Sequence, residues 1–387
     1  MTDGGHTGAP VALRTIVREW TRLGVIGFGG PPAHIALLRR MCVEERSWMD
    51  AKEFEDGVAA TNLLPGPAST QLAIYCAWKL RGAPGALLGG LCFIAPGLAL
   101  IMALSSVFLS HHPPTWILGA AAGAGAAVPA VALRAASRLV APSWLRAGEE
   151  RGQRLRWGAY ALIGAVSAAV LGAYLVVALV ACGLAEVALR SRGTLSPRAM
   201  AGGAGVHALG LGGVGALSWV ALKVGALSYG GGFVIVPLMQ HDVVSTYHWM
   251  SGTQFLSAVA LGQVTPGPVV PTIAVVGYAA GGFAGALLAS LVAFGPSFLF
   301  VLFGAPLFSK ARSNRTAASF LLGAGPTVIG AIAGSAVPLG LSLHFWWQVP
   351  VLGAALVWCL LARRGVVSVL LACAALGVLL AILGVGV

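Results

Sequence analysis

The sequence has 387 residues, of which 58% are hydrophobic and only 9% are charged, and its formal net charge is +12. Soluble domains carry charge on about a quarter of their residues, so this composition excludes an ordinary soluble protein and indicates an integral membrane protein. Nucleic acid is excluded as a partner because the arginines lie in short segments between apolar runs, which is the pattern of cytoplasmic loops.

The chain opens on a polar segment without a basic-then-apolar leader, so no cleaved signal peptide is expected. Its six cysteines are scattered without CxxC spacing, mostly within apolar runs. They are expected to be small core residues rather than disulfides or metal ligands. The sequence therefore predicts no cofactor and no metal site.

In the first half of the chain, apolar runs predict membrane spans near residues 12–38, 85–110 and 115–133, with two further crossings within 157–189. The run 85–110 contains no charged residue, and about 20 apolar residues cross a bilayer as a helix. The region 157–189 is short for two crossings, and Gly172 is the only break it offers. The 54 glycines suit close helix packing in lipid.

The first predicted span contains the glycine-rich segment "GFGGPPAHI", residues Gly27 to Ile35. Adjacent glycines unwind a helix and permit positive φ, so the N–H groups around Gly29 and Gly30 can form an anion-binding nest. Arg22 precedes this break and is either a substrate-facing cation or a residue that snorkels to the interface. His34 follows the break and is either a ligand or an ordinary satisfied polar residue.

A second break is the Pro-Gly-Pro of "NLLPGPASTQLAIY". Proline inside a helix removes a backbone donor and clashes with the preceding turn, at a cost of roughly 3 kcal/mol. A new half-helix is expected to begin after the break, and its first N–H groups have no intrahelical partner. That terminus carries a partial positive charge and is a ready anion site. The candidate residues are Pro65, Gly66, Pro67, Ser69, Thr70 and Gln71.

In the second half, spans are predicted near residues 212–238, 285–309, 317–341, 346–362 and 366–387, and a second Pro-Gly-Pro lies within 254–278. Lys223 stands in a long apolar run, and an ionisable residue inside a membrane is a functional candidate by default. The other second-half candidates are Gly230, Gly231, Thr265, Pro266, Gly267, Pro268 and Thr272.

The two halves are a tandem repeat. At an offset of 201, "GVIGFGG" at Gly24 falls on "GALSYGG" at Gly225, and the two Pro-Gly-Pro motifs coincide. After a gap of one residue the offset is 200, and "GAG" at Gly123 falls on "GAG" at Gly323. Two structural units are therefore predicted, residues 1–195 and 196–387.

The loop charges reverse sign between the halves. Loop 39–52 carries four Lys or Arg residues where its counterpart has none, whereas the neutral "HHPP" at 111–114 corresponds to the basic 310–315. Because Lys and Arg stay in the cytoplasm, the halves are expected to insert upside down relative to each other, as in secondary transporters. The predicted fold is an all-α integral membrane protein of two inverted repeats, each with about five transmembrane helices and a re-entrant Pro-Gly-Pro hairpin.

A re-entrant hairpin places its break at membrane depth, where broken backbone is tolerated only inside protein or beside a water-filled cavity. Two inverted copies would aim two half-helix N-termini at one point. With Arg22 and Lys223 as matched cations, these residues predict a site for a tetrahedral dianion. The alternative is that both motifs are plain kinks, since proline is common in membrane helices.

The motifs "GFGGPPAHI", "LPGPAST" and the second-half "YGGG…Q…PGP" resemble the two-domain chromate transporter family over nearly the whole chain. The resemblance implies an inner-membrane exporter of chromate that confers resistance, depends on the proton-motive force and has sulfate as a competing analogue. It carries over Arg22, Phe28, Gly29, Gly30, Pro31, His34, the two Pro-Gly-Pro motifs, Lys223 and Gly230 to Gly232. The family usually has Asn-Ser-Thr-Glu after the first motif. Here Gln71 replaces the acid, which weighs against a proton carried there.

Several alternatives stay open at the level of the sequence. Chromate and sulfate share charge and shape, so only the resemblance selects chromate. An uncoupled anion channel would use the same site. An enzyme would need an acidic metal-binding cluster or a nucleophile–base pair, and neither is evident. Asp56 and Asp242 are candidates for a coupled proton or for helix caps, and Glu186 is expected at the cytoplasmic end of a span. Lipid is an expected partner, and a homodimer is open.

Overall fold

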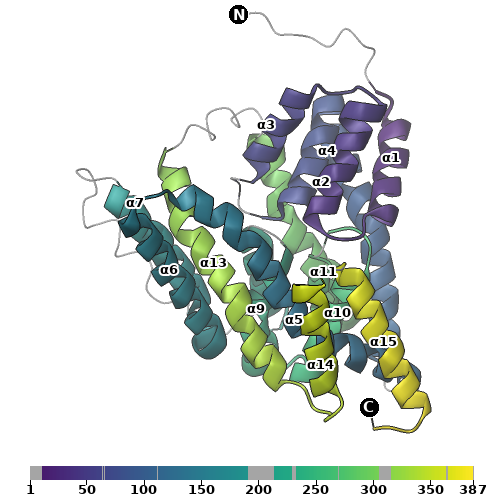
Figure 1. The fold of residues 1–387 in the computed structure, drawn as a ribbon. Coiled ribbons are helices and arrows are strands. Elements are labelled where there is room, and N and C mark those ends of the chain that lie inside the picture. The colour runs from purple at the N-terminus through teal and green to yellow at the C-terminus, as the bar shows by residue number, and fades with distance from the viewer. Residues whose placement is uncertain are drawn as a thin grey trace, which may run out of the picture.

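The computed structural model describes residues 11–62, 64, 66–110, 112–190, 213–228, 232–268, 270–304, 315–362 and 365–386. These residues form helices and no strand (Figure 1), so the all-α prediction is confirmed for the described part of the chain. Four of its helices are long and apolar enough to cross a membrane: α4 (Ala68–Phe108), α5 (Thr115–Ala147), α11 (Thr272–Gly304) and α13 (Arg315–Leu341).

The remaining elements of the first half are shorter. They are α1 (Leu13–Ile26), α2 (Pro31–Arg39), the π-turn η1 (Arg40–Glu45), α3 (Ala51–Thr61), α6 (Arg151–Val166), η2 (Ser167–Leu171), η3 (Gly172–Tyr174) and α7 (Leu175–Arg190). Those of the second half are α8 (Gly213–Leu227), η5 (Gly232–Val234), α9 (Ile235–Gln240), the π-turn η6 (His241–Thr246), α10 (Gly252–Val264), α14 (Gln348–Leu356), η8 (Val357–Leu361) and α15 (Val366–Ile382).

The backbone of the second half repeats irregular details of the first. Helix α4 is kinked at Gly82, with φ 60° and ψ −148°, and α11 is kinked at Gly282, with φ 60° and ψ −150°. Two residues after η1 and after η6 the chain has a non-glycine residue with positive φ, Ser47 at 49° and His248 at 51°. These positions match at the offsets of 200 and 201, so the internal repeat extends to unusual backbone conformations.

Counterpart helices of the two halves run in opposite directions. Gln348 Nε2 donates to Ala122 O at 3.0 Å, and Arg134 donates to Cys359 O, so α14 and α5 run parallel. A short loop at the lower end of Figure 1 turns α13 back into α14. Helix α5 is therefore antiparallel to its counterpart α13, as an inverted repeat requires.

The halves exchange helices. Helix α5 packs against α14 and α15 of the second half, while α13 packs against α6 and α7 of the first. Glycine permits the close approach: a Cβ on Gly330 would lie 1.8 Å from Ala161 O, and one on Gly119 would lie 2.4 Å from Gly377 O. Small residues at such contacts are typical of helices that pack in lipid. The two sequence repeats therefore do not pack as two separate bodies.

Two of the predicted first-half spans differ from the observed helices, whereas the break expected at Gly172 is present. The predicted span 12–38 is two helices, α1 and α2, because the glycines after Ile26 break it. The predicted span 115–133 continues to Ala147, so Arg134 and Arg138 lie on α5 rather than in a loop. The region 157–189 contains two helices, and the chain turns at Gly172, whose φ is +35°.

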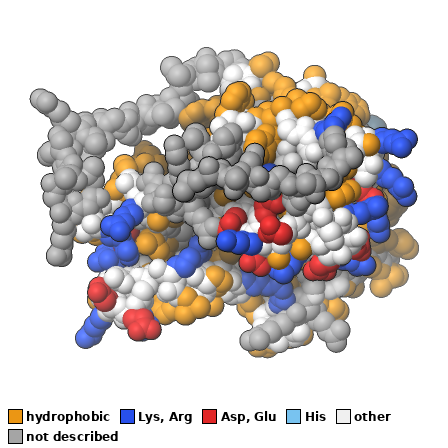
Figure 2. Space-filling model, turned by 90° about the horizontal axis from the view of Figure 1, so that it is seen from above, with side chains coloured by type: hydrophobic (Ala, Val, Ile, Leu, Met, Phe, Trp, Pro, Cys, Tyr) orange, Lys and Arg blue, Asp and Glu red, His pale blue; other side chains and the backbone are white. Residues whose placement is uncertain are grey.

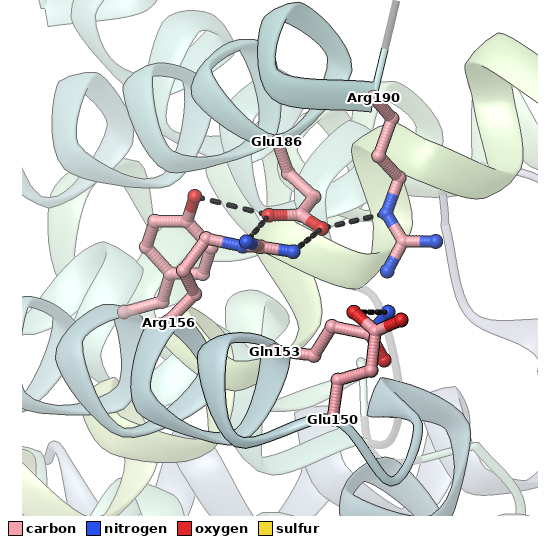
Figure 3. Close-up of polar contacts among 6 residues, drawn as sticks. Glu150, Gln153, Arg156, Glu186 and Arg190 are labelled. Atoms are coloured by element: carbon pink, nitrogen blue, oxygen red, sulfur yellow. Dashed lines mark hydrogen bonds and ion pairs between the residues drawn. The ribbon is translucent and has the colours of Figure 1, made fainter.

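A buried carboxylate joins α6 to α7 (Figure 3). Glu186 is 3% exposed and accepts from Arg156 Nε at 3.0 Å, from Arg190 Nε at 2.6 Å and from the Tyr160 hydroxyl at 3.2 Å. Its oxygens are satisfied by two guanidinium groups and a phenol. The cluster therefore holds the two first-half helices on which α13 packs.

Replacing Glu186 with alanine is expected to lower the free energy of unfolding by about 2 kcal/mol, because two arginines lose their shared acceptor. This is less than for a fully buried pair, since Arg156 and Arg190 remain about one-third exposed. The measurement is thermal unfolding in detergent. Glu150 provides the matched control because its carboxylate is exposed and accepts a hydrogen bond from the Gln153 side chain at 3.0 Å, with no ion pair among the described residues. Equal losses of thermal stability for Glu186→Ala and Glu150→Ala would contradict the stabilising role of the Glu186 cluster.

Candidate anion-binding cavity

A cavity of about 290 Å³ lies between the two halves. It is lined by the starts of α2, α4 and α15, by one stretch of α5, and by the end of α10 with the Pro-Gly-Pro that follows it. Of the predicted site residues, Gly29, Gly30, Pro67, Ser69, Thr265, Gly267 and Pro268 line it. Residues from the first-half glycine break and from both Pro-Gly-Pro breaks therefore meet at one cavity.

Glycine conformations build the breaks. Gly29 and Gly30 have φ of +104° and +74°, and α2 begins at the next residue, Pro31. Gly66 and Gly267, at the centres of the two Pro-Gly-Pro motifs, have φ of +114° and +91°. Residues other than glycine rarely adopt these angles, so the four glycines fix the turns that bring the backbone to the cavity.

Each Pro-Gly-Pro packs against the opposite half. The N–H of Gly267 donates to Gly27 O at 2.8 Å. A Cβ on Gly97 of α4 would lie 2.2 Å from Pro266 O. In the mirrored contact, a Cβ on Gly66 would lie 3.2 Å from Gly225 O of α8. The breaks are therefore part of the contact between the halves, and the cavity forms only when the halves are assembled.

The start of α4 directs a helix N-terminus at the cavity. The N–H groups of Thr70 and Gln71 donate to Pro67 O at 3.0 Å, which leaves those of Ala68 and Ser69 without an acceptor inside the helix. Ala68 and Ser69 both line the cavity. This terminus carries a partial positive charge, about +0.5 for a full helix, so it favours an anion.

His34 links the two breaks of the first half from behind this terminus. Its Nε2 lies 2.9 Å from Gly27 O and its Nδ1 lies 3.3 Å from Ser69 Oγ. A carbonyl oxygen can only accept, so Nε2 donates, and Nδ1 of the neutral ring accepts from the Ser69 hydroxyl. His34 is 1% exposed and does not line the cavity, so its contacts position the site rather than reach a ligand.

Two arginines that follow the predicted span 115–133 lie on the cavity wall. Arg134 and Arg138 are one turn apart on α5. Arg134 is 5% exposed and donates to Cys359 O, whereas Arg138 is exposed. No carboxylate is among the described residues that line the cavity. A wall with one buried and one exposed cation and no acid favours an anion, because an anion offsets the cost of desolvating the Arg134 guanidinium.

Carboxamides complete the donor set. Asn62 and Gln263 occupy equivalent positions at the offset of 201, just after α3 and at the end of α10, and both line the cavity. The Nε2 atom of Gln263 is buried and has no partner among the described residues. Thr265 donates to Gly262 O at 3.3 Å. A ligand with several acceptor oxygens would satisfy the free amide.

Other predicted site residues lie away from the cavity wall. Thr70, Gln71 and Thr272 are fully buried in the first turns of α4 and α11, and Gly66 and Pro266 are covered by the opposite half. Pro65, Gly230 and Gly231 lie outside the described residues. Substrate binding by these residues stays a prediction.

The two cations matched in sequence, Arg22 and Lys223, do not line the cavity. The side chain of Arg22 is 65% exposed and lies 3.8 Å from Glu19. Lys223 forms an ion pair with Asp242, and both side chains are nearly buried, at 13% and 14% exposed. Lys223 therefore has a counter-ion within the protein, because η6 brings Asp242 against α8.

Comparisons with known proteins agree along most of the chain. The family described as "Chromate transporter" matches residues 14–187 and 215–378. The chain is 33% identical to a chromate transport protein of Cupriavidus metallidurans, covering 86% of this chain and 84% of that one. It is 30% identical to a probable chromate transport protein of Synechococcus elongatus, covering 88% of each. It is 31% identical to a chromate transport protein of Pseudomonas aeruginosa, covering 85% and 82%. No solved structure matches.

Proposed function

Since this chain belongs to the chromate transporter family, we propose that it exports chromate across the inner membrane as a secondary active transporter and thereby confers chromate resistance. The chain is a membrane transporter and not an enzyme. We further propose that the cavity between the halves is its substrate site, with the two Pro-Gly-Pro breaks as the parts that shape it.

The observation that carries the proposal is the pair of cations, Arg134 and Arg138, on a cavity wall where the described residues include no carboxylate. Chromate at neutral pH is largely a tetrahedral dianion, so it would balance both charges. A planar guanidinium offers several N–H donors in a fixed fork, which suits an oxyanion better than a point-like ammonium does. The N-terminus of α4 and the Gln263 amide add donors on other sides of the anion.

Coupling to protons is part of the proposal. Lysine and arginine predominate in the loops expected to be cytoplasmic, which gives the orientation of the chain. A dianion that leaves the cytoplasm carries negative charge outward. Exchange for protons would then draw on the proton-motive force. Gln71 is buried and uncharged, so the proton would be carried elsewhere. Sulfate has the same charge and nearly the same shape, and is therefore the competing substrate to test.

The test uses purified protein in proteoliposomes loaded with unlabelled chromate or sulfate, with labelled chromate outside. Coupled exchange is expected to give transient accumulation of label above its outside concentration, because inside substrate returns the empty carrier. An imposed proton gradient should increase the rate, and excess sulfate should lower it. An uncoupled channel would equilibrate label without accumulation. Transport of sulfate but not chromate would replace the substrate and keep the site.

A further inference from the structure

The two halves differ in how they contact the six helices α5, α6, α7, α13, α14 and α15, here called the bundle. In the second half, α10 packs against α5 and α15, and α9 packs against α13 and α7. By the repeat, α3 should pack in the same way against α13 and α7, and α2 against α5 and α15. Within the described residues, none of these four counterpart pairs reaches comparable packing.

Burial shows the same asymmetry. Along α10, the residues from Phe255 to Ala260 are all buried, and along α9 so are those from Ile235 to Met239. On α2 only His34 and Leu38 are buried. At equivalent positions on α10 and α3, Leu256 is 1% exposed whereas the side chain of Glu55 is 64% exposed. Helices α9 and α10 of the second half therefore pack on the bundle, whereas, within the described residues, their counterparts α2 and α3 do not.

A matched pair of glycines on the bundle locates the difference. A Cβ on Gly125 of α5 would lie 3.4 Å from Leu256 Cβ, so α10 is seated directly on that glycine. The counterpart on α13 is Gly325, where the nearest atom to a Cβ, among the residues that the structure describes, is Ser143 Oγ at 4.0 Å. That neighbour belongs to α5, so α3 does not fill the equivalent place.

The cavity lies on the unpacked side. Its lining includes the starts of α2 and α15 and the α5 stretch around Arg138. In the other half, the equivalent helices α9, α13 and α7 pack against one another instead. Beyond Arg134, α5 continues past the exposed Arg138 to the exposed Arg146. Figure 2 shows Lys and Arg side chains gathered on the upper face of Figure 1. Basic residues mark the cytoplasmic face.

We propose that Leu256 on Gly125 is a closed gate, that Glu55 and Gly325 form its counterpart, open here toward the cytoplasm, and that the transport cycle exchanges the two. The inference rests on the proposed transport function. In the second state α3 packs on α13 while α10 leaves α5, so that Asn62 becomes covered and Gln263 accessible from the other side. Movement of one repeat or bundle against another around a fixed site is how inverted repeats alternate access.

Disulfide trapping tests both gates. In a cysteine-free parent, one variant carries Gly125→Cys with Leu256→Cys, and the matched variant carries Glu55→Cys with Gly325→Cys. The Cβ separation at the closed gate suits a disulfide, so oxidation should cross-link that pair in resting vesicles. The counterpart pair should cross-link only while sulfate and a proton gradient are supplied. Either disulfide should reduce chromate uptake at least tenfold, and a reductant should restore it. The four single-cysteine variants are the controls.

The outcomes separate the gates from the transport function. If the parent transports chromate but the Glu55–Gly325 pair never cross-links during transport, the exchange of gates is overturned. Normal uptake with the Gly125–Leu256 disulfide in place would overturn it equally. If the parent moves no chromate although each pair cross-links under its own condition, the gates stand and the proposed substrate fails.

Discussion

Replacing Arg134 with glutamine is expected to reduce chromate transport to the background of cells that lack the protein. Arg134 is 5% exposed on the cavity wall, so a bound dianion would lose a desolvated, charged donor there. Removing one partner of a buried, hydrogen-bonded charge pair, here Arg134 and the bound dianion, costs about 3 kcal/mol, which is roughly 100-fold in affinity. The measurement is initial uptake of labelled chromate by inverted vesicles at equal abundance of each variant.

Arg138 is the matched control because it lines the same cavity on the same helix but is exposed to solvent. Arg138→Gln should lower affinity by about tenfold or less, since solvent screens its charge. Arg134→Lys keeps the charge but loses the planar fork and the bond to Cys359 O, so partial activity is expected. Full transport by Arg134→Gln would remove Arg134 from the substrate site.

Replacing Lys223 with glutamine is expected to reduce the amount of folded protein in the membrane as well as transport. The substitution leaves Asp242 nearly buried without its cation, and breaking a buried pair costs about 3 to 5 kcal/mol. The double variant, Lys223→Gln with Asp242→Asn, removes both charges and should recover most of the abundance. The readouts are immunoblotted membrane protein, thermal stability in detergent, and chromate uptake.

The same double variant separates two roles for Lys223. If the lysine serves mainly to neutralise Asp242, transport should return together with abundance. A double variant that is abundant but inactive would instead support the sequence-based prediction that Lys223 takes part in substrate binding. Arg22→Gln is the control at the matched position, and its exposed side chain predicts little effect on abundance.

Glycine and proline made the backbone breaks predictable. Only particular residues tolerate positive φ or interrupt a helix, so Gly29, Gly66 and Gly267 signalled turns at the level of the sequence. The repeat register then indicated that two breaks correspond. Each residue type acts locally at these positions, which is why reading along the chain located the backbone breaks that contribute to the cavity wall.

Long-range features could not be read in the same way. The predicted span 115–133 ends before Arg134 because arginine usually ends a membrane span, although the pattern "VALRAASRLVA" continues the helix with Arg134 and Arg138 one turn apart. The partner of Lys223 depends on how η6 folds back on α8. The exchange of helices between halves depends on glycine and alanine contacts, and these residues do not specify which helix they meet.

The exchange of helices also bears on how the protein is made. Helices α6 and α7 are synthesised well before α13, the helix against which both pack. Until α13 emerges from the ribosome, the small-residue faces around Ala161 and Cys182 can meet only lipid or the insertion machinery. Such non-local pairing slows folding. Assembly therefore has to wait for nearly the whole polypeptide, and a chain truncated after the first repeat would leave α6 and α7 without their main packing partner.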